Sequence, residues 1–171
     1  MRKSRVWLTL ICCIFSMAAV AGAQGRKPGL WEMTTTMTWQ KSPFPEGMMG
    51  GPGGATSPMN GAPRAVQVCL TQAQIDKYGG PVPQTRSGCQ LTNFVKTSDR
   101  VVGDMVCSGV MSGKGSFESS WNSEGRATGK VHFVGSVKAG GPTPKPVEWT
   151  SESTSVYKGP TCGGVKPWAD R

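Results

Sequence analysis

Apolar and polar side chains alternate along residues 29–40. On one side lie two tryptophans and two methionines, Trp31, Met33, Met37 and Trp39, while the other side carries threonines and other polar residues. Because successive side chains of a β-strand point to opposite faces, this period of two predicts a strand with one largely apolar face. The many threonines favour the same structure, since branching at Cβ suits an extended backbone.

The alternation recurs in six further segments, and turn-forming stretches such as Asn122-Ser123-Glu124-Gly125 separate them. Short connections join antiparallel neighbours, whereas parallel strands need crossovers of helical length, which this sequence lacks. Long twisted strands tend to curl, so we predict an all-β fold: an antiparallel meander of about seven strands that forms a curved sheet or a barrel. Besides residues 29–40, the predicted strands are 64–69, 88–96, 101–110, 115–121, 127–138 and 146–157.

One short helix is predicted between the second and third strands. Thr71 is a suitable N-cap, Gln74 stands three residues later at the partner position of a capping box, and Gly79 suits the helix end. Prolines follow at once and prevent continuation. The helix should run from about Gln72 to Tyr78.

Residues 42–63 differ in composition from the rest of the chain. Of these 22 residues, 11 are glycine or proline, so the segment is expected to be a flexible loop that contributes nothing to a packed core. Three of its other residues are methionines, Met48, Met49 and Met59.

The chain begins with a pattern typical of a secretory signal peptide. Three cationic residues lie within residues 1–5, a mainly apolar run follows over residues 6–20, and Ala21-Gly22-Ala23 offers the small residues of a cleavage site. The run is shorter than the roughly 20 apolar residues that span a bilayer, so we expect cleavage after Ala23 and a periplasmic location. The chain then divides into a signal peptide (1–23), a single β-rich domain (24–162) and a C-terminal tail (163–171), with Trp168 as a possible anchor.

Four of the six cysteines lie beyond the predicted cleavage site. In an exported chain an even number of cysteines indicates disulfides, and four cysteines allow three pairings. A polar turn centred on Ser98 lies midway between Cys89 and Cys107, so a hairpin at this turn favours their pairing. The remaining pair is then Cys69 and Cys162.

Five short sequence features follow one another along the chain. They are Lys27-Pro28-Gly29-Leu30-Trp31-Glu32, Val68-Cys69-Leu70-Thr71, the pair Cys89 and Cys107, Gly113-Lys114-Gly115-Ser116-Phe117, and Thr161-Cys162-Gly163. With this combination the chain resembles the bacterial exported family classed as domain of unknown function 3617, over nearly all of the sequence after the signal peptide. The resemblance implies a periplasmic or envelope location and supplies no catalytic residues.

The charge of the chain is basic but thinly spread. The formal net charge is +9, and removal of residues 1–23 takes away three cationic and no acidic residues, which leaves +6. After residue 23 no run of lysine or arginine is longer than two. We therefore expect no nucleic-acid partner and no stable membrane insertion, only weak attraction to anionic envelope surfaces.

Few side chains are suited to catalysis. His132 is the only histidine, and it falls on the polar side of its predicted strand, where it is expected to be solvated. Glu118, Glu148 and Glu152 fall on polar sides as well. Because no set of acid, base and nucleophile converges and no catalytic motif is present, we expect no enzymatic activity and no cofactor.

Methionine offers one route to metal binding. Met33 and Met37 share a strand face, residues 42–63 add three more methionines, and thioether sulfur suits Cu(I). Methionine is also common core filler, so Met-based copper binding is a minority hypothesis and we expect no metal site.

The aromatic face of the predicted sheet suggests a binding protein. We expect a noncatalytic role in which the curved sheet holds a small apolar or amphipathic ligand or an envelope component. The alternative is an envelope scaffold or interaction protein in which the same side chains form only a core. The candidate ligand-binding residues are Trp31, Met33, Trp39, Phe117, Trp121 and Trp149.

Overall fold

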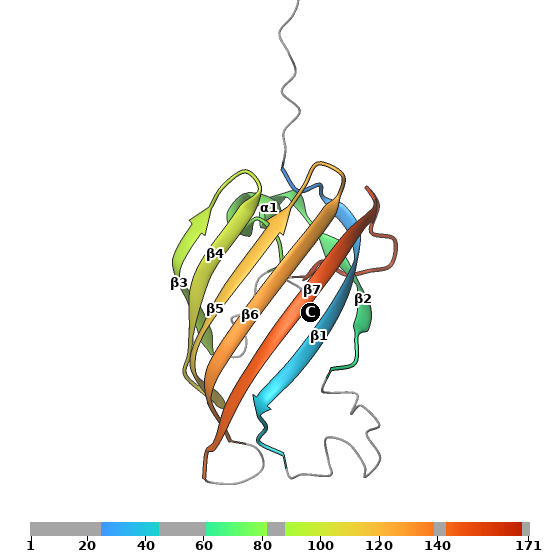
Figure 1. Cartoon of the computed structure of the whole chain (residues 1–171). Helices are drawn as coiled ribbons and strands as arrows, with labels where there is room; N and C mark the ends of the chain where they lie inside the picture. The colour runs from blue at the N-terminus through green and yellow to red at the C-terminus, as the bar shows by residue number, and fades with distance from the viewer. Residues whose placement is uncertain (1–24, 45–60, 82–87, 139–142, 169–171) are drawn as a thin grey trace, which may run out of the picture.

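Seven antiparallel strands form one sheet in the computed structural model, which describes residues 25–44, 61–81, 88–138 and 143–168 (Figure 1). This confirms the predicted all-β class and the single short helix. The strands are β1 (Gly29–Lys41), β2 (Arg64–Leu70), β3 (Cys89–Lys96), β4 (Arg100–Cys107), β5 (Met111–Trp121), β6 (Arg126–Val137) and β7 (Lys145–Gly159), and the helix is α1 (Gln72–Tyr78).

The predicted signal peptide and most of the predicted loop, residues 45–60, lie outside the described residues. Strands β3 to β7 form a meander, because each pairs with the next along the chain. The first strand then joins the far side of the last, with pairs from Leu30 opposite Gly159 to Lys41 opposite Glu148. The complete order is β2-β1-β7-β6-β5-β4-β3.

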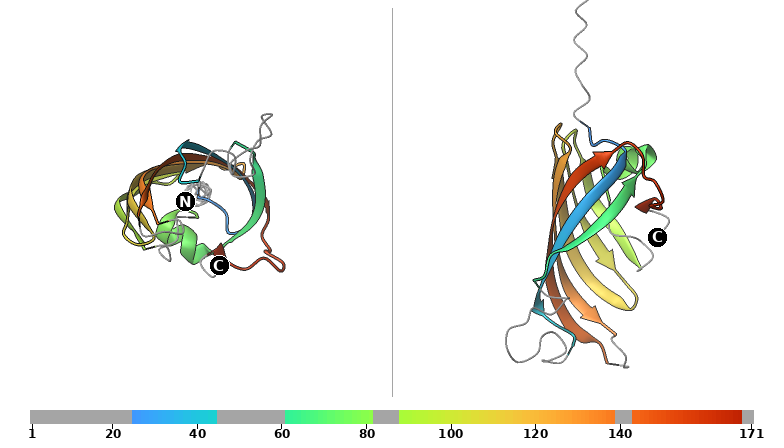
Figure 2. Two further views of the ribbon diagram at one scale, coloured as in Figure 1. Left: turned by 90° about the horizontal axis from the view of Figure 1, so that it is seen from below. Right: turned by 90° about the vertical axis from the view of Figure 1, so that its right-hand side faces the viewer.

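The sheet curls into an incomplete ring, which is visible from below (Figure 2, left). Strands β2 and β3 are the two edges of the sheet and do not pair with each other, so the curved sheet, and not the closed barrel, is the form observed. Helix α1 and the C-terminal segment lie at the gap between these edges. They contact the edges at Cys69 of β2 and Lys96 of β3, which protects part of each edge from pairing with other chains.

Helix α1 has the predicted capping box. The Thr71 hydroxyl accepts a hydrogen bond from the backbone N–H of Gln74 (3.3 Å), and the Gln74 side-chain oxygen accepts one from the backbone N–H of Thr71 (2.9 Å). Gly79 ends the helix with a φ of 73°, a conformation that favours glycine. Lys96 of β3 donates to the carbonyl of Ile75 (3.1 Å) and so holds the helix against the edge strand.

Both predicted disulfides are present. Cys89 and Cys107 are bonded and stand opposite each other on β3 and β4. Cys69 is bonded to Cys162, and a parallel bridge between Cys69 and Pro167 places the C-terminal segment beside β2. In the chain-entropy model the shorter closure stabilises the fold by about 3 kcal/mol and the longer one by about 4.5 kcal/mol.

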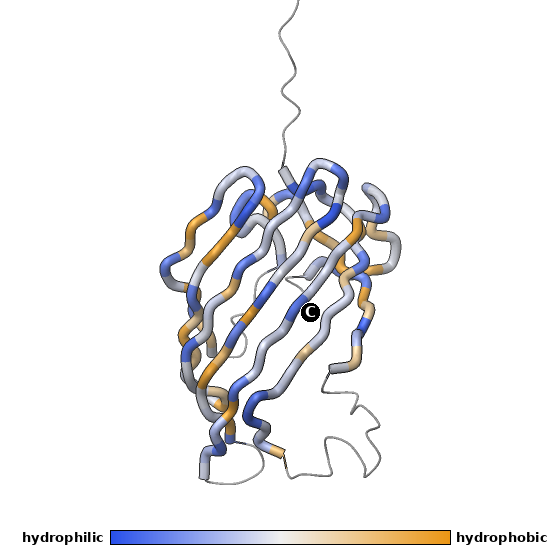
Figure 3. Tube along the Cα trace, in the orientation of Figure 1, coloured by the Kyte–Doolittle hydropathy of each residue, from blue (hydrophilic) through white to orange (hydrophobic). Residues whose placement is uncertain are grey.

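The hydropathy of the strands alternates along their length, as Figure 3 shows most clearly for β4 to β6. The inward side chains form two groups of buried residues. The Trp31 cluster consists of Trp31, Val68, Leu70, Ile75, Val101, Phe117, Trp121 and Ala127. The Phe133 cluster consists of Cys89, Met105, Cys107, Phe133 and Val147.

Two phenylalanine rings fill space that inward-facing glycines leave open. A Cβ atom at Gly103 would lie 2.8 Å from the Phe117 ring, and one at Gly135 would lie 2.9 Å from the Phe133 ring. Phe133 is completely buried. The rings therefore pack on glycine backbone, which lets a strongly curved sheet hold large side chains on its concave side.

Candidate functional site

The inner face of the sheet becomes polar between the two apolar clusters. Cross-strand pairing aligns Thr35 of β1, Ser153 of β7, Gly129 of β6 and Ser119 of β5 in one row. Small polar side chains also precede and follow Ser153 on the same side of its strand. We call the five hydroxyl-bearing residues the inner hydroxyl patch: Thr35, Ser119, Ser151, Ser153 and Ser155.

The inner hydroxyl patch lines a cavity of about 210 Å³. Met33, Phe117, Val131 and Trp168 give this cavity an apolar wall, and Arg26 reaches it from the segment before β1. A concave site of mainly apolar walls with a few convergent polar groups is the usual form of a small-ligand pocket.

The hydroxyls of the patch are only partly used within the protein. Ser119 donates to the Thr128 carbonyl (2.9 Å), and Ser153 donates at the limit of hydrogen-bond distance to the Gly129 carbonyl (3.5 Å). The other three hydroxyls make no side-chain hydrogen bond within the described part of the chain. Their hydrogen-bonding capacity is therefore available to a molecule in the cavity.

Arg26 is the charged side chain of this cavity that lies deepest. Only 5% of it is exposed, and its guanidinium stacks over the Trp31 ring at 4.6 Å from the ring centroid. Burial lowers the pKa of Arg26 to about 10, because the charged form loses solvation. The side chain therefore stays cationic at neutral pH.

The six predicted ligand-binding residues divide among three places. Met33 and Phe117 line the cavity. Trp31 and Trp121 are buried in the Trp31 cluster, where the indole N–H of Trp121 donates to the Ser98 carbonyl (2.9 Å). Trp39 and Trp149 pack against the Phe133 cluster, and Trp149 stacks on Phe133 with centroids 5.7 Å apart.

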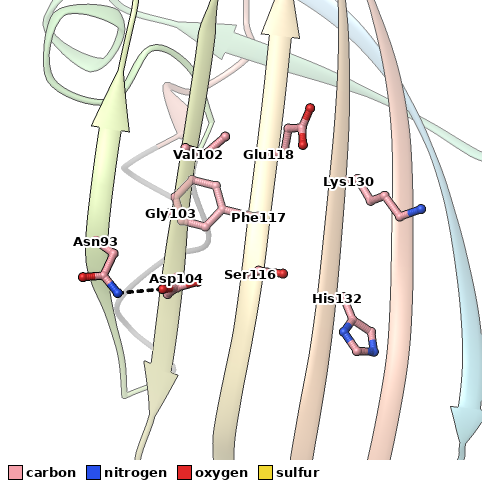
Figure 4. Close-up of a pocket in the computed structure, with 9 residues that line it drawn as sticks. All are labelled: Asn93, Val102, Gly103, Asp104, Ser116, Phe117, Glu118, Lys130 and His132. Carbon is pink, nitrogen blue, oxygen red and sulfur yellow. Dashed lines mark hydrogen bonds between the residues drawn. The ribbon is translucent and has the colours of Figure 1, made fainter.

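Two hollows on the outer face of the sheet are the other candidate sites. One, of about 400 Å³, is drawn in Figure 4, where Asp104, Glu118 and His132 come from three neighbouring strands and Asn93 of β3 donates to Asp104 (2.7 Å). The second, of about 460 Å³, lies over β1, β5, β6 and β7. Both are open to solvent, where water competes for every polar contact.

The charges around these outer hollows already pair with one another. Glu118 accepts from Arg100 at 3.1 Å, and Lys130 pairs with Glu152 at 3.1 Å. These side chains are each more than half exposed. The outer hollows therefore offer a neutralised, hydrated surface, whereas the inner cavity holds a charge that is still available.

His132 and Glu148 lie on the outer face, as the alternation predicted. The imidazole of His132 is 3.4 Å from the Glu148 carboxylate, and Lys41 lies 3.1 Å from the same group. A hydrogen bond from Lys41 and, to a smaller extent, one from His132 lower the pKa of Glu148. A carboxylate held ionised by hydrogen bonds from a lysine and an imidazole is suited to joining strands and not to proton transfer at neutral pH.

The structure describes only two of the five methionines proposed for copper. Met33 and Met37 lie on the inner face of β1, while Met48, Met49 and Met59 lie outside the described residues. Across residues 25–44, 61–81, 88–138 and 143–168, no three His, Cys, Asp or Glu side chains gather closely enough to hold a metal ion.

Sequence reasoning missed Arg26 and the inner hydroxyl patch. Arg26 precedes the first strand, so no periodicity indicates where it points. The serines did leave a signal: Ser151, Ser153 and Ser155 occupy the same alternate positions as Val147 and Trp149. Small polar residues on the apolar side of a strand indicate an interior that its own side chains do not fill.

The fold and the cavity define a class: a single-sheet β-protein with two disulfides and a small chamber on its concave face. The chain belongs to the family described as protein of unknown function DUF3617, which matches residues 26–162. No curated protein and no solved structure matches it. Within the described residues, no helix has the length and hydrophobicity to cross a membrane.

Proposed function

We propose that this protein is a noncatalytic, exported protein that binds a small amphipathic molecule in the inner cavity. The observation that carries the proposal is the polar, partly empty middle of the concave face. A concave cavity of about 210 Å³ with apolar walls and unused hydroxyls has the form of a small-ligand site.

The proposed location is the periplasm, reached through a signal peptide cleaved after Ala23. The two disulfides support it, because such bonds persist in oxidising compartments and are rare in the cytosol. Fractionation of cells that express the full chain, with N-terminal sequencing of the product, tests this part. A product that retains residues 1–23 would contradict it.

A filling substitution tests the ligand site. Ser153→Phe places a large ring in the cavity, whereas Thr154→Phe places the same ring on the outer face of the same strand, beside the second outer hollow. Each variant and the wild type would be purified gently from cells and analysed by native mass spectrometry before and after organic extraction.

The expected result is an extractable small molecule on the wild type and on Thr154→Phe, and its loss from Ser153→Phe. Loss from Thr154→Phe alone would move the site to the outer face. A wild-type protein that binds neither a co-purified molecule nor any amphiphile added in titration would favour the envelope scaffold instead.

A further inference from the structure

Arg26 is a buried cation whose donors are not all used. Its Nε and Nη1 atoms are buried and have no hydrogen-bond partner. The side chain fits closely against Gly80, where a Cβ atom would lie 2.3 Å from Nη1. The backbone thus leaves room for a guanidinium at this place, yet no described residue supplies an acceptor for these two atoms.

No carboxylate in the described part of the chain forms an ion pair with Arg26. Among the described residues that line the cavity, Glu118 is the one acidic residue, and its side chain is 54% exposed and paired with Arg100 on the outer face. The Trp31 ring offers only its π-face, which attracts a cation but accepts no in-plane hydrogen bond. Buried charges in proteins are normally paired, and the described residues supply no partner for Arg26.

We infer that Arg26 binds the carboxylate head group of the ligand, which is a short single-chain carboxylate. This inference rests on the proposed function. A guanidinium presents parallel N–H donors that match the two oxygens of a carboxylate. The hydroxyls of Ser151, Ser153 and Ser155 accept or donate further hydrogen bonds near the head group, while Met33, Phe117, Val131 and Trp168 contact the alkyl chain.

The cavity volume sets the size of this ligand. About 210 Å³ corresponds to roughly seven water molecules at about 30 Å³ each. Pockets for drug-sized molecules start at about 300 Å³, so a two-chain phospholipid is too large. Octanoate, with one carboxylate and a flexible chain, is a suitable probe.

The test is isothermal titration calorimetry with octanoate and with 1-octanol, which has the same chain and no charge. The proteins are the wild type, Arg26→Met and a matched control, Arg126→Met, whose side chain is exposed on β6. We expect the wild type and Arg126→Met to bind octanoate at least roughly tenfold more tightly than octanol, as a charge-assisted pair requires. Arg26→Met should lose this preference and keep its affinity for octanol.

Equal binding of octanoate and octanol by the wild type would overturn the role of Arg26 and leave the ligand-binding function in place. Retained preference in a folded Arg26→Met protein would overturn it too. Binding of neither probe would overturn both proposals. If Arg26→Met does not fold, the wild-type preference for octanoate is compared with that of Arg26→Lys. This variant keeps the positive charge but lacks the paired N–H donors of a guanidinium, so it should keep only part of the preference.

Discussion

On the outer face of the sheet, Lys130 of β6 and Glu152 of β7 stand opposite each other and form an exposed ion pair. On the inner side Arg26 is buried, and none of the described residues is an acidic partner for it. The outer pair joins two strands in water, where each charge would be well solvated on its own. The inner charge is desolvated, and among the described residues the Trp31 ring is the group that compensates for it.

The difference teaches how to separate structural from functional charge in a small β-protein. Outer charges pair across strands and contribute to register and solubility, so removing one changes little. A buried inner charge lowers stability. Unfavourable groups of this kind concentrate at active and binding sites, where they serve a function. The following predictions each test one side of this contrast.

The largest effect is expected from the apolar part of the inner face. Phe133→Ala should lower the free energy of unfolding by about 3–5 kcal/mol, because the ring is completely buried and leaves a cavity. Val134→Ala, one residue further and 46% exposed on the other face, should cost no more than about 0.5 kcal/mol. Urea unfolding followed by tryptophan fluorescence measures both, and equal losses would show that the two faces do not differ as described.

Arg26→Met should raise the stability of the ligand-free protein. The fall of the Arg26 pKa to about 10 corresponds to a loss of about 3 kcal/mol of solvation free energy on folding. The cation–π contact with the Trp31 ring offsets about 2 kcal/mol of this loss. The expected gain is therefore about 1 kcal/mol by thermal or urea unfolding. Arg100→Met on the outer face should instead lower stability by at most about 1 kcal/mol. A large loss for Arg26→Met would mean that this arginine is a structural part of the core.

The Lys130–Glu152 pair should contribute little. A double-mutant cycle with Lys130→Met and Glu152→Gln is expected to give a coupling of about 0.2–1 kcal/mol, which should nearly vanish in about 1 M salt. A coupling that persists in salt would show that this outer pair is shielded from solvent.

The smallest effect concerns Glu148 and depends on pH. Because Lys41 and His132 lower its pKa in the folded protein, the stability it contributes is present above its ordinary pKa of 4.5 and is lost as the pH falls through the lowered value. Lys41→Met should therefore destabilise slightly at about pH 7 and not at about pH 2.5, and should raise the Glu148 pKa in a carboxyl NMR titration. The same destabilisation at both pH values would contradict an electrostatic cause.

The sequence predicted the strands, the helix and both disulfides because each rests on local rules. Alternation identifies a strand, a capping box identifies a helix start, and a turn midway between two cysteines brings them together. Even here the structure adds one detail: Asn93, at a φ of 50°, shifts the register of β3 against β4 between Thr92 and Val95. Asparagine tolerates that conformation better than most residues, but its sequence context gave no sign of a bulge.

The strand order and the site were harder to predict. Pairing of β1 with β7 depends on how far the whole sheet curls, which no local pattern encodes. The site depends on two small signals: serines at inward positions of β7, and an arginine before the first strand whose position follows only from the folded shape. Because aromatic residues were used as the signal for a ligand site, the prediction included Trp39 and Trp149. Both pack against the Phe133 cluster, and neither lines the polar cavity.

The pairing of the first strand with the last has a consequence for biogenesis. During synthesis β1 is made early, but β7, one of its two neighbours in the sheet, is the last of the seven strands to be made. The β3–β4 hairpin and its Cys89–Cys107 bond can form before then, whereas the Cys69–Cys162 bond can form only once Cys162 has been made. The sheet therefore cannot reach its final form, and its inner cavity cannot be completed, until the end of the chain has been synthesised.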